Sequence, residues 1–243
     1  MSSGREFGLS VVVPFYNEAE CAADAVLEIA RALGGWPGGL EIVAVNDGSA
    51  DGTLEALESL RGKVAGLEIC DVRPHSGQSA ALYWGIRRAR GRLIATIDGD
   101  MQNEPADLPA LAAALDRADL VVGWRVTRRD AWLRRVSSLA ANSLRRFVLR
   151  DGVHDTGCGL KVFRRDAREA LVPFQGMHRF IPALFRAHGL RVAEVPVRHR
   201  PRIRGRSKYG VGNRLFRGLL DLWGVWWLSR RAVAGRPQGE DAA

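Results

Sequence analysis

Short apolar runs alternate with longer amphipathic stretches along the first hundred residues of the chain. The apolar runs are rich in β-branched residues and end in polar turn residues, which is typical of buried strands, whereas the stretches between them carry Ala and Leu at helical spacing. We therefore predict four strands, at 9–14, 40–45, 67–72 and 93–97, and three helices between them, at 18–33, 53–60 and 77–89. This succession predicts an α/β fold with a mainly parallel, Rossmann-like sheet and helices on both faces.

The alternation breaks after residue 123, where a basic stretch begins. Farther along the chain we predict a helix-like segment at 132–149, a late strand at 192–197 and a polar, basic loop at 198–209. The last part, from 212 to 231, has the pattern of an amphipathic helix. The expected organisation is one α/β domain at 7–210, that helix at 211–232 and a disordered tail at 233–243.

The charge balance indicates an anionic partner. The 243 residues include 36 Lys and Arg against 27 Asp and Glu, a net charge of +9, while 47% hydrophobic residues exclude wholesale disorder. Nucleic acid, an acidic membrane surface and a phosphorylated substrate all fit this balance, so charge alone leaves the three open.

The cysteines and the N-terminal residues indicate the compartment. Cys21, Cys70 and Cys158 are isolated, without the spacing of a disulfide framework or a structural zinc site, so a reducing cytosol is expected. The N-terminal residues lack the long apolar core of a secretion signal, and no run of 18 uncharged apolar residues occurs. We therefore expect neither a cleaved leader nor a spanning helix.

The candidate chemistry begins with three polar residues directly after the predicted strand at 93–97. Because alternate side chains of an extended chain point the same way, Asp98, Asp100 and Gln102 can direct oxygens at one point. Oxygen ligands suit a hard cation such as Mg²⁺ or Mn²⁺, which could also contact phosphate oxygens. Two acids flanking a glycine also occur in solvated turns, so the triplet alone does not decide.

Other polar residues follow the neighbouring predicted strands. Asn17, Asp47 and His75 would join Asp98 at the carboxyl edge of a parallel sheet, where the ligands of such sheets gather. The segment 46–52 could equally be a turn with a helix cap, since Asp, Ser and Gly favour both. For His75 a structural position in the loop is the favoured interpretation.

Three segments together resemble family 2 glycosyltransferases: 13–18, 46–53 and 98–102, each after a predicted strand. Within that family the likeness is closer to the polyprenyl-phosphate group, typified by dolichyl-phosphate mannosyltransferase and its bacterial relatives. The finer likeness rests on the triplet at 98–102, on Arg134, Ser138 and Asn142 in the predicted helix, and on 204–209. It covers most of the chain and implies that 7–210 is a catalytic domain of the GT-A type.

The resemblance also implies roles for single residues. It implies a metal at Asp98, Asp100 and Gln102, and an acceptor phosphate held by Arg125, Arg134 and Ser138. The implied donor-binding residues are Pro14, Tyr16, Asn17, Glu18, Asp47, Gly77, Asp98, Arg204 and Lys208, and the implied catalytic residues are Asp98, Asp100, Arg125 and Arg134. From the residues alone, the helix face with Arg134 could instead be solvated, and the loop with Lys208 could be a nonspecific basic loop.

The implied activity is inverting transfer of a hexose from a nucleotide sugar to a polyprenyl phosphate, such as dolichyl or undecaprenyl phosphate. GDP-mannose is the favoured donor and a UDP-sugar is the other. The second ionisation of a phosphate monoester lies near pH ~6, so the acceptor oxygen is already anionic and needs no general base. The alternatives are a family 2 enzyme with a soluble or glycan acceptor and, from other classes, a basic nucleic-acid-binding protein or a non-catalytic scaffold. We expect no nucleic acid partner, because acids cluster at the strand ends.

The predicted C-terminal helix fits a lipid acceptor. Trp223, Trp226 and Trp227 lie beside arginines in a stretch that Arg217 and Asp221 make too polar to span a membrane. Such a helix could lie at the headgroup boundary or pack on the core of its own domain. We expect a peripheral enzyme on the inner, cytoplasmic face of the cytoplasmic membrane. No oligomeric state follows from the sequence.

Overall fold

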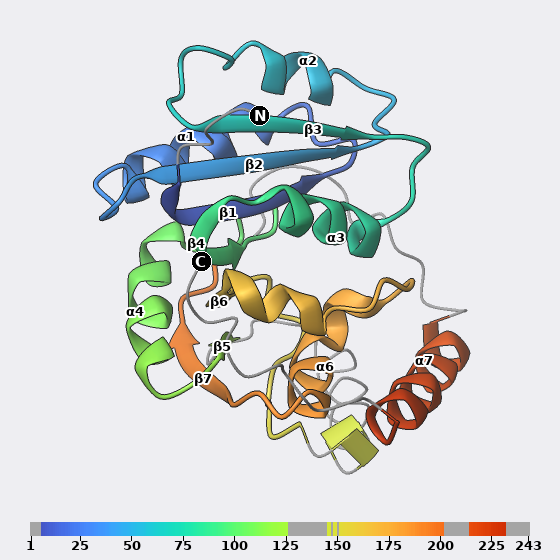
Figure 1. The fold of residues 1–243 in the computed structure, drawn as a ribbon. Coiled ribbons are helices and arrows are strands. Elements are labelled where there is room, and N and C mark those ends of the chain that lie inside the picture. The colour runs from blue at the N-terminus through green and yellow to red at the C-terminus, as the bar shows by residue number, and fades with distance from the viewer. Residues whose placement is uncertain (1–5, 126–144, 147, 150, 202–213, 232–243) are drawn as a thin grey trace.

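A seven-stranded sheet forms the centre of the protein, with helices on both faces (Figure 1). The computed structural model describes residues 6–125, 145–146, 148–149, 151–201 and 214–231. The strands lie in the order β3-β2-β1-β4-β6-β5-β7, with bounds β1 Phe7–Phe15, β2 Leu40–Asp47, β3 Leu67–Val72, β4 Gly91–Thr96, β5 Leu120–Arg125, β6 Lys161–Arg164 and β7 Val192–Val197. β6 is antiparallel to β4 and β5, and the other neighbours are parallel. The predicted mainly parallel sheet is thus confirmed.

The helices follow the strands as the apolar pattern predicts. Their bounds are α1 Ala22–Leu33, α2 Thr53–Glu58, α3 Gln78–Arg88, α4 Leu108–Ala113, α6 Ile181–Ala187 and α7 Arg214–Ser229. The predicted start of the first helix, at residue 18, is wrong. Asn17 has a left-handed backbone with φ 49°, and the N–H of Glu18 donates to Thr53 Oγ1 at 2.8 Å, so the chain makes a turn before Ala22. Most of the predicted helix at 132–149 lies outside the described residues.

The two faces of the sheet bury separate apolar clusters. Along β1, Val11 and Val13 point to the face that α1 and α4 cover, whereas Val12 points to the face covered by α3 and α6. All three valines are fully buried, as the two-residue period of a strand requires. α3 lies so close to the sheet that a Cβ at Gly85 would be 2.4 Å from Val12 Cγ1, which explains a glycine inside this helix.

The sequence pattern does not predict β6, because this strand has only four residues and begins and ends with a cation. Its register places Lys161 opposite Thr96, at the carboxyl end of β4. Since β6 runs antiparallel to β4, the chain that precedes it arrives at the edge of the sheet where the parallel strands end. β6 therefore brings the segment 155–160 beside the residues that follow β4.

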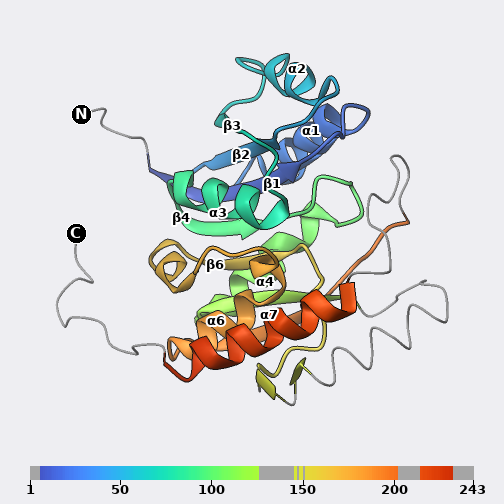
Figure 2. The same cartoon turned by 90° about the vertical axis from the view of Figure 1, so that its right-hand side faces the viewer.

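The C-terminal helix α7 packs along α6 (Figure 2). Its buried Leu222 and Val225 join Phe180 and Ala183 in a small apolar cluster. Its outer side carries exposed residues, at 54% for Leu220, 63% for Trp223 and 46% for Trp227. One face of the predicted amphipathic helix therefore covers the domain, and the other is uncovered within the described chain. Among the described residues, no helix has the length and apolar character needed to cross a membrane.

Candidate active site

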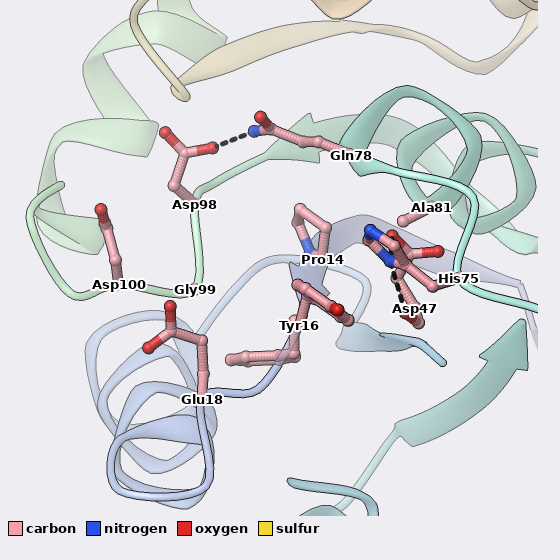
Figure 3. Close-up of a pocket in the computed structure, with 11 residues that line it drawn as sticks. Pro14, Tyr16, Glu18, Asp47, His75, Gln78, Ala81, Asp98, Gly99 and Asp100 are labelled. Atoms are coloured by element: carbon pink, nitrogen blue, oxygen red, sulfur yellow. Dashed lines mark hydrogen bonds and ion pairs between the residues drawn. The ribbon is translucent and has the colours of Figure 1, made fainter. Parts of the chain in front are cut away.

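A cleft opens at the carboxyl edge of the sheet, where β1, β2 and β4 end side by side (Figure 3). Residues from four segments line it: Pro14, Phe15, Tyr16, Glu18, Asp47, His75, Gln78, Ala81, Asp98, Gly99 and Asp100. The structure thus brings together five of the predicted donor-binding residues. The remaining predicted ones, Asn17 and Gly77, build the walls from behind, and Arg204 and Lys208 lie outside the described residues.

Asp47 organises one end of the cleft. Its carboxylate is 2% exposed and accepts hydrogen bonds from the backbone N–H groups of Ser76, at 2.9 Å, and Gly77, at 2.8 Å. His75 Nδ1 lies 2.9 Å from Asp47 Oδ2. These contacts fix the turn that enters α3, so Asp47 holds the wall of the cleft in place. Its predicted contact with a donor nucleotide stays a prediction.

The same end of the cleft has a flat aromatic surface. The rings of Tyr16 and His75 stack with centroids 3.7 Å apart and an angle of 15° between their planes. The sequence interpretation of His75 as a loop residue missed this position, although its place after a predicted strand is the signal that points to it. A stacked pair of rings beside a carboxylate can hold a planar base or a ribose.

Asn17 and Gly77 shape the cleft through their backbone. The side-chain carbonyl of Asn17 accepts a hydrogen bond from the N–H of Ala50 at 2.8 Å, and the backbone N–H of Asn17 donates to Ser49 Oγ at 2.9 Å. These bonds tie the loop after β1 to the loop after β2. Gly77 has φ 88°, a left-handed value that suits glycine, and it directly precedes α3.

The other end of the cleft carries two carboxylates, as the sequence predicts. Asp98 accepts a hydrogen bond from Gln78 Nε2 at 2.8 Å, and Figure 3 shows Asp100 and Glu18 on the same side. Burial raises the pKa of Asp98, and the nearby Asp100 acts in the same direction, while Lys161 and Arg125 oppose them. The negative charge of Asp100 acts on Asp98, so this pair of carboxylates fits a divalent cation, which would relieve their repulsion.

The side chain of the third predicted metal ligand, Gln102, has another partner, although its backbone N–H donates to Asp100 Oδ1 at 3.2 Å. Gln102 is not part of the cleft lining, and its Nε2 donates to the carbonyl of Arg200 at 3.4 Å. Within the described residues, no cluster of three or more His, Cys, Asp or Glu side chains could hold a metal. Asp98 and Asp100 are therefore the described residues suited to Mg²⁺ or Mn²⁺, with substrate oxygens or water completing the shell. A role for Gln102 as ligand stays a prediction.

The segment before β6 packs directly on Asp98. A Cβ placed on Gly159 would lie 2.4 Å from Asp98 Oδ2 and 2.9 Å from Asn103 Nδ2, so any larger residue here has to displace the Asp98 carboxylate. The carbonyl of Gly159 in turn accepts a hydrogen bond from Thr96 Oγ1 at 2.7 Å. Asp98 is thus positioned from the side of β6 as well as by Gln78.

A second cavity of about 300 Å³ adjoins the cleft and shares Gln78 and Asp98 with it. The remaining lining comes from α3, β4, the segment before β6 and the turn at Met177–Arg179: Leu82, Thr96, Thr156, Gly157, Cys158, Gly159, Lys161, His178 and Arg179. The sequence pattern does not indicate His178 and Arg179 as site residues. Their position depends on a contact between segments about a hundred residues apart, such as the 2.8 Å hydrogen bond between Ser79 Oγ and His178 Nδ1.

Arg125 lies at the end of β5 and is mostly buried. Its Nε and Nη2 donate to the two carboxylate oxygens of Asp155 at 2.7 and 2.9 Å, a bidentate pair. Arg125 lines neither the cleft nor the second cavity. Its predicted partners Arg134 and Ser138 lie outside the described residues. The assignment of these three residues to an acceptor phosphate therefore stays a prediction.

Two curated proteins resemble this chain over most of its length. The dodecaprenyl-phosphate galacturonate synthase of Rhizobium johnstonii is 40% identical over 228 residues, which are 91% of this chain and 67% of that protein. The undecaprenyl-phosphate 4-deoxy-4-formamido-L-arabinose transferase of Edwardsiella ictaluri is 33% identical over 205 residues, 84% of this chain and 63% of that protein. The chain thus spans about two thirds of the length of these relatives.

Solved structures share the fold. The glucosyl-3-phosphoglycerate synthase of Mycobacterium tuberculosis, solved with Mn²⁺ and UDP, has a TM-score of 0.65 at 20% identity over 96% of this chain and 82% of that chain. A mannosyltransferase of Pyrobaculum calidifontis, solved with GDP-mannose and Mn²⁺, has a TM-score of 0.64 at 20% identity over 95% of this chain and 66% of that chain. These likenesses confirm the predicted GT-A fold.

The family follows from the part of the chain that builds the cleft. Residues 10–172 match the model of glycosyl transferase family 2, and this range includes the loops after β1, β2 and β4 and the segment that packs on Asp98. Both curated relatives have names that include a polyprenyl phosphate. On this match, together with the fold and the paired carboxylates at the end of β4, the chain belongs to glycosyl transferase family 2.

Proposed function

We propose that this protein transfers a sugar, which we expect to be a hexose, from a nucleotide sugar to a polyprenyl phosphate with inversion at the anomeric carbon. One observation carries the proposal: Asp98 and Asp100 line the same cleft as the Tyr16 and His75 ring pair, at opposite ends (Figure 3). A nucleotide sugar needs both ends, one for its base and ribose and one for its diphosphate. The names of the two curated relatives support a polyprenyl phosphate as acceptor.

The residues of the cleft divide the binding of the donor. Tyr16, His75 and Asp47 would receive the nucleoside, Pro14 would lie between them and the acids, and Glu18 would lie on the side of Asp100. Asp98 and Asp100 would hold Mg²⁺ or Mn²⁺, and the bound ion would neutralise charge on the diphosphate as it leaves. Gln78 keeps the Asp98 carboxylate oriented through its 2.8 Å hydrogen bond.

The acceptor's own chemistry limits what the protein has to supply. A phosphate monoester is largely dianionic at neutral pH, so no side chain has to remove a proton from it. The need is instead for cations that bring a second anion close to the donor diphosphate. We assign this role to Arg125 and Arg134, with the hydroxyl of Ser138 as a further hydrogen-bond donor, and we assign Arg204 and Lys208 to the donor diphosphate.

The outer face of α7 is our candidate for membrane contact. Leu220, Trp223 and Trp227 are exposed there, and the guanidinium of Arg231 lies 4.9 Å from the centroid of the Trp227 ring. Tryptophan beside arginine suits the boundary between lipid headgroups and acyl chains. We propose that this face rests on the cytoplasmic surface of a membrane, where a polyprenyl phosphate would be found.

Vesicle flotation tests the membrane contact. The double variant Trp223→Ser and Trp227→Ser should lose most of its binding to vesicles that contain anionic lipid, because it loses two interfacial anchors. Trp84→Ser is the matched control, since Trp84 is 51% exposed but lies on α3. Equal binding by the double variant and the wild type would refute this use of α7.

A radiolabel transfer assay tests the activity itself. The protein, Mg²⁺ or Mn²⁺ and a short polyprenyl phosphate are combined with single labelled UDP- and GDP-sugars, and label in the lipid phase is measured. Asp100→Ala should lower transfer by about 100-fold or more, whereas Asp116→Ala, at an exposed acid away from the cleft, should leave it unchanged. Label that enters a soluble sugar acceptor instead of the lipid would refute the assignment of the acceptor.

The donor panel has to include more than the favoured GDP-mannose. That preference rests on the resemblance to dolichyl-phosphate mannosyltransferase, whereas the two curated relatives are named for galacturonate and for a formamido-arabinose. UDP-galacturonate, UDP-glucuronate, UDP-galactose, UDP-glucose and GDP-mannose therefore belong in the same experiment. The donor that labels the lipid identifies the sugar.

A further inference from the structure

The second cavity contains a buried cation that lacks a carboxylate partner in the described part of the chain. Lys161 is 4% exposed, and among the described residues its ammonium makes one hydrogen bond, of 2.5 Å to the carbonyl of Cys158, and no ion pair. Burial lowers the pKa of Lys161, while the charge of Asp98 favours its protonated form. A charged group out of water is costly unless an anion or several hydrogen bonds compensate it, so this cavity suits an anionic ligand.

The other residues that line the cavity also favour an anionic ligand. Arg179, an exposed residue, lines it together with Lys161, and the hydroxyl of Thr156 adds a neutral donor. Among the described residues of the lining, Asp98 is the one carboxylate, and it belongs to the proposed metal site. Once a divalent cation occupies that site, the cavity presents two cations and an excess of hydrogen-bond donors.

The hydrogen bonds around His178 determine which of its ring nitrogens carries the proton. Burial, with Arg179 and Lys161 acting in the same direction, lowers the pKa of His178 to about 3, so the ring is neutral at physiological pH. Ser79 Oγ accepts the backbone N–H groups of Gly176, at 3.0 Å, and His178, at 3.5 Å, which use both of its acceptor positions, and it lies 2.8 Å from His178 Nδ1. The hydroxyl proton of Ser79 is thus donated to Nδ1, and the ring hydrogen sits on Nε2. His178 therefore adds a further N–H donor to the cavity lining.

We propose that the second cavity binds the sugar of the donor and that Lys161, Arg179 and His178 select a sugar with a carboxylate, a hexuronate. This inference rests on the proposed function. The nucleoside and diphosphate would fill the first cleft as far as Asp98, and the cavity begins at Asp98 and Gln78, where the sugar comes next along the donor. Its volume of about 300 Å³ is at the low end for small-molecule sites, as expected for a single sugar ring.

A neutral hexose would satisfy this cavity less well. Its hydroxyl groups can accept hydrogen bonds from Thr156 and His178, but they leave the buried ammonium of Lys161 without an opposite charge. A carboxylate accepts charge-assisted hydrogen bonds from both cations, which are roughly twice as strong as neutral ones. A site built for such contacts rejects an analogue that lacks the charged group, because the buried Lys161 then gains no carboxylate partner.

Matched donor pairs test the inference. UDP-galacturonate and UDP-galactose differ only in having a carboxylate or a hydroxymethyl group at C6, and UDP-glucuronate and UDP-glucose form a second such pair. With polyprenyl phosphate as acceptor, we expect kcat/KM for one of the uronates to exceed that of its neutral partner by about 100-fold or more. Arg179→Gln should lower this ratio by about tenfold, mainly through a higher KM for the uronate donor.

Further variants make the ratio specific. Lys161→Met should also lower the ratio of kcat/KM for the uronate to that for the neutral donor. Arg179→Lys should keep part of this preference because it keeps the positive charge. Arg165→Gln is the matched control, since Arg165 is a partly exposed arginine that pairs with Glu6 and does not line the cavity, so this variant should leave the ratio unchanged. Arg179 is exposed, so its variant tests the cavity even if Lys161→Met fails to fold.

Two results would overturn the inference while leaving the proposed function intact. One is equal use of uronate and neutral donors. The other is a rise in the KM for polyprenyl phosphate, by the same factor with either donor, in Arg179→Gln, because the cavity would then bind the acceptor phosphate. If no donor labels the lipid, the proposed function fails. Calorimetry with Mn²⁺ then still tests the uronate preference of the second cavity: tighter binding of UDP-galacturonate than of UDP-galactose supports this preference, and equal binding refutes it.

Discussion

Replacing Gly159 by alanine should damage activity far more than stability. The new Cβ would lie 2.4 Å from Asp98 Oδ2 and 2.5 Å from Asp98 Cγ. Non-bonded heavy atoms prefer separations near ~3.5 Å, so the carboxylate has to move by about 1 Å. Asp98 is also held by Gln78, at 2.8 Å, and a shift of that size would break this bond.

The expected loss of stability is smaller than the expected loss of activity, because the atoms that the new Cβ contacts belong to the carboxylate of Asp98, which can move. Overpacking a core costs about 1–3 kcal/mol, and a carboxylate at the edge of a cleft can rotate away, so we expect about 1 kcal/mol, or roughly 2–4 °C in Tm. A displacement of about 1 Å in a group that positions a reacting substrate costs about 100-fold in rate. We therefore expect kcat for sugar transfer to fall by about 10- to 100-fold.

The measurement combines steady-state transfer to polyprenyl phosphate with thermal unfolding of the same preparation. Gly35→Ala is the matched control, because a Cβ there meets nothing within 4 Å, and it should change neither quantity. A Gly159→Ala protein with a kcat within threefold of the wild type would refute the reasoning. It would mean that the segment before β6 moves aside, or that the position of Asp98 does not limit the reaction.

Three other changes follow from contacts described above. Asp47→Asn leaves one buried N–H of the turn before α3 without an acceptor, which should lower the free energy of unfolding by about 1–3 kcal/mol in denaturant titrations, and an unchanged midpoint would contradict this role. Gly224→Ala, in α7 with open space around it, should raise stability by up to about 1 kcal/mol in the same assay, and a loss would contradict the open surroundings. Because the folded pKa of His178 is about 3, below the value near ~6.5 of an unfolded histidine, protons favour unfolding as pH falls from ~6.5 toward 3. His178→Gln should therefore lose less stability than the wild type between pH 7 and pH 5, and parallel losses would contradict the buried, neutral ring.

The sequence pattern predicts the sheet better than the site. Strands such as β3, at Leu67–Val72, and β7, at Val192–Val197, coincide with the predicted ranges, because apolar residues recur along them although charged residues interrupt both runs. β6 escapes prediction because pairing on both sides, and not its own four residues, makes it a strand. The predicted start of α1 is wrong for a similar reason, since a hydrogen bond from the N–H of Glu18 to Thr53 Oγ1, 35 residues away, holds the turn that precedes the helix.

The same division holds for the site. Asp98 and Asp100 follow a strand directly, so their place at the edge of the sheet can be predicted from the local pattern. His75, Gln78 and His178 gain their positions from partners far along the chain: Asp47, Asp98 and Ser79. No local period encodes such pairs, and a single sequence therefore indicates the acids of the cleft but not the side chains that orient them.

If α7 contacts a membrane as proposed, its packing on α6 determines how far a lipid acceptor has to reach into the protein. Asp221 of α7 lies beside Gly176, since a Cβ added to Gly176 would come within 2.8 Å of the Asp221 carboxylate. Phe180, which packs against α7 in the small apolar cluster, directly follows the Arg179 that lines the second cavity. With Trp223 and Trp227 at the membrane surface, an isoprenoid could keep its whole tail among the acyl chains and extend only its phosphate. The enzyme would then bind the phosphate and make no contact with the tail, so polyprenyl phosphates of different length should bind the same site with similar affinity.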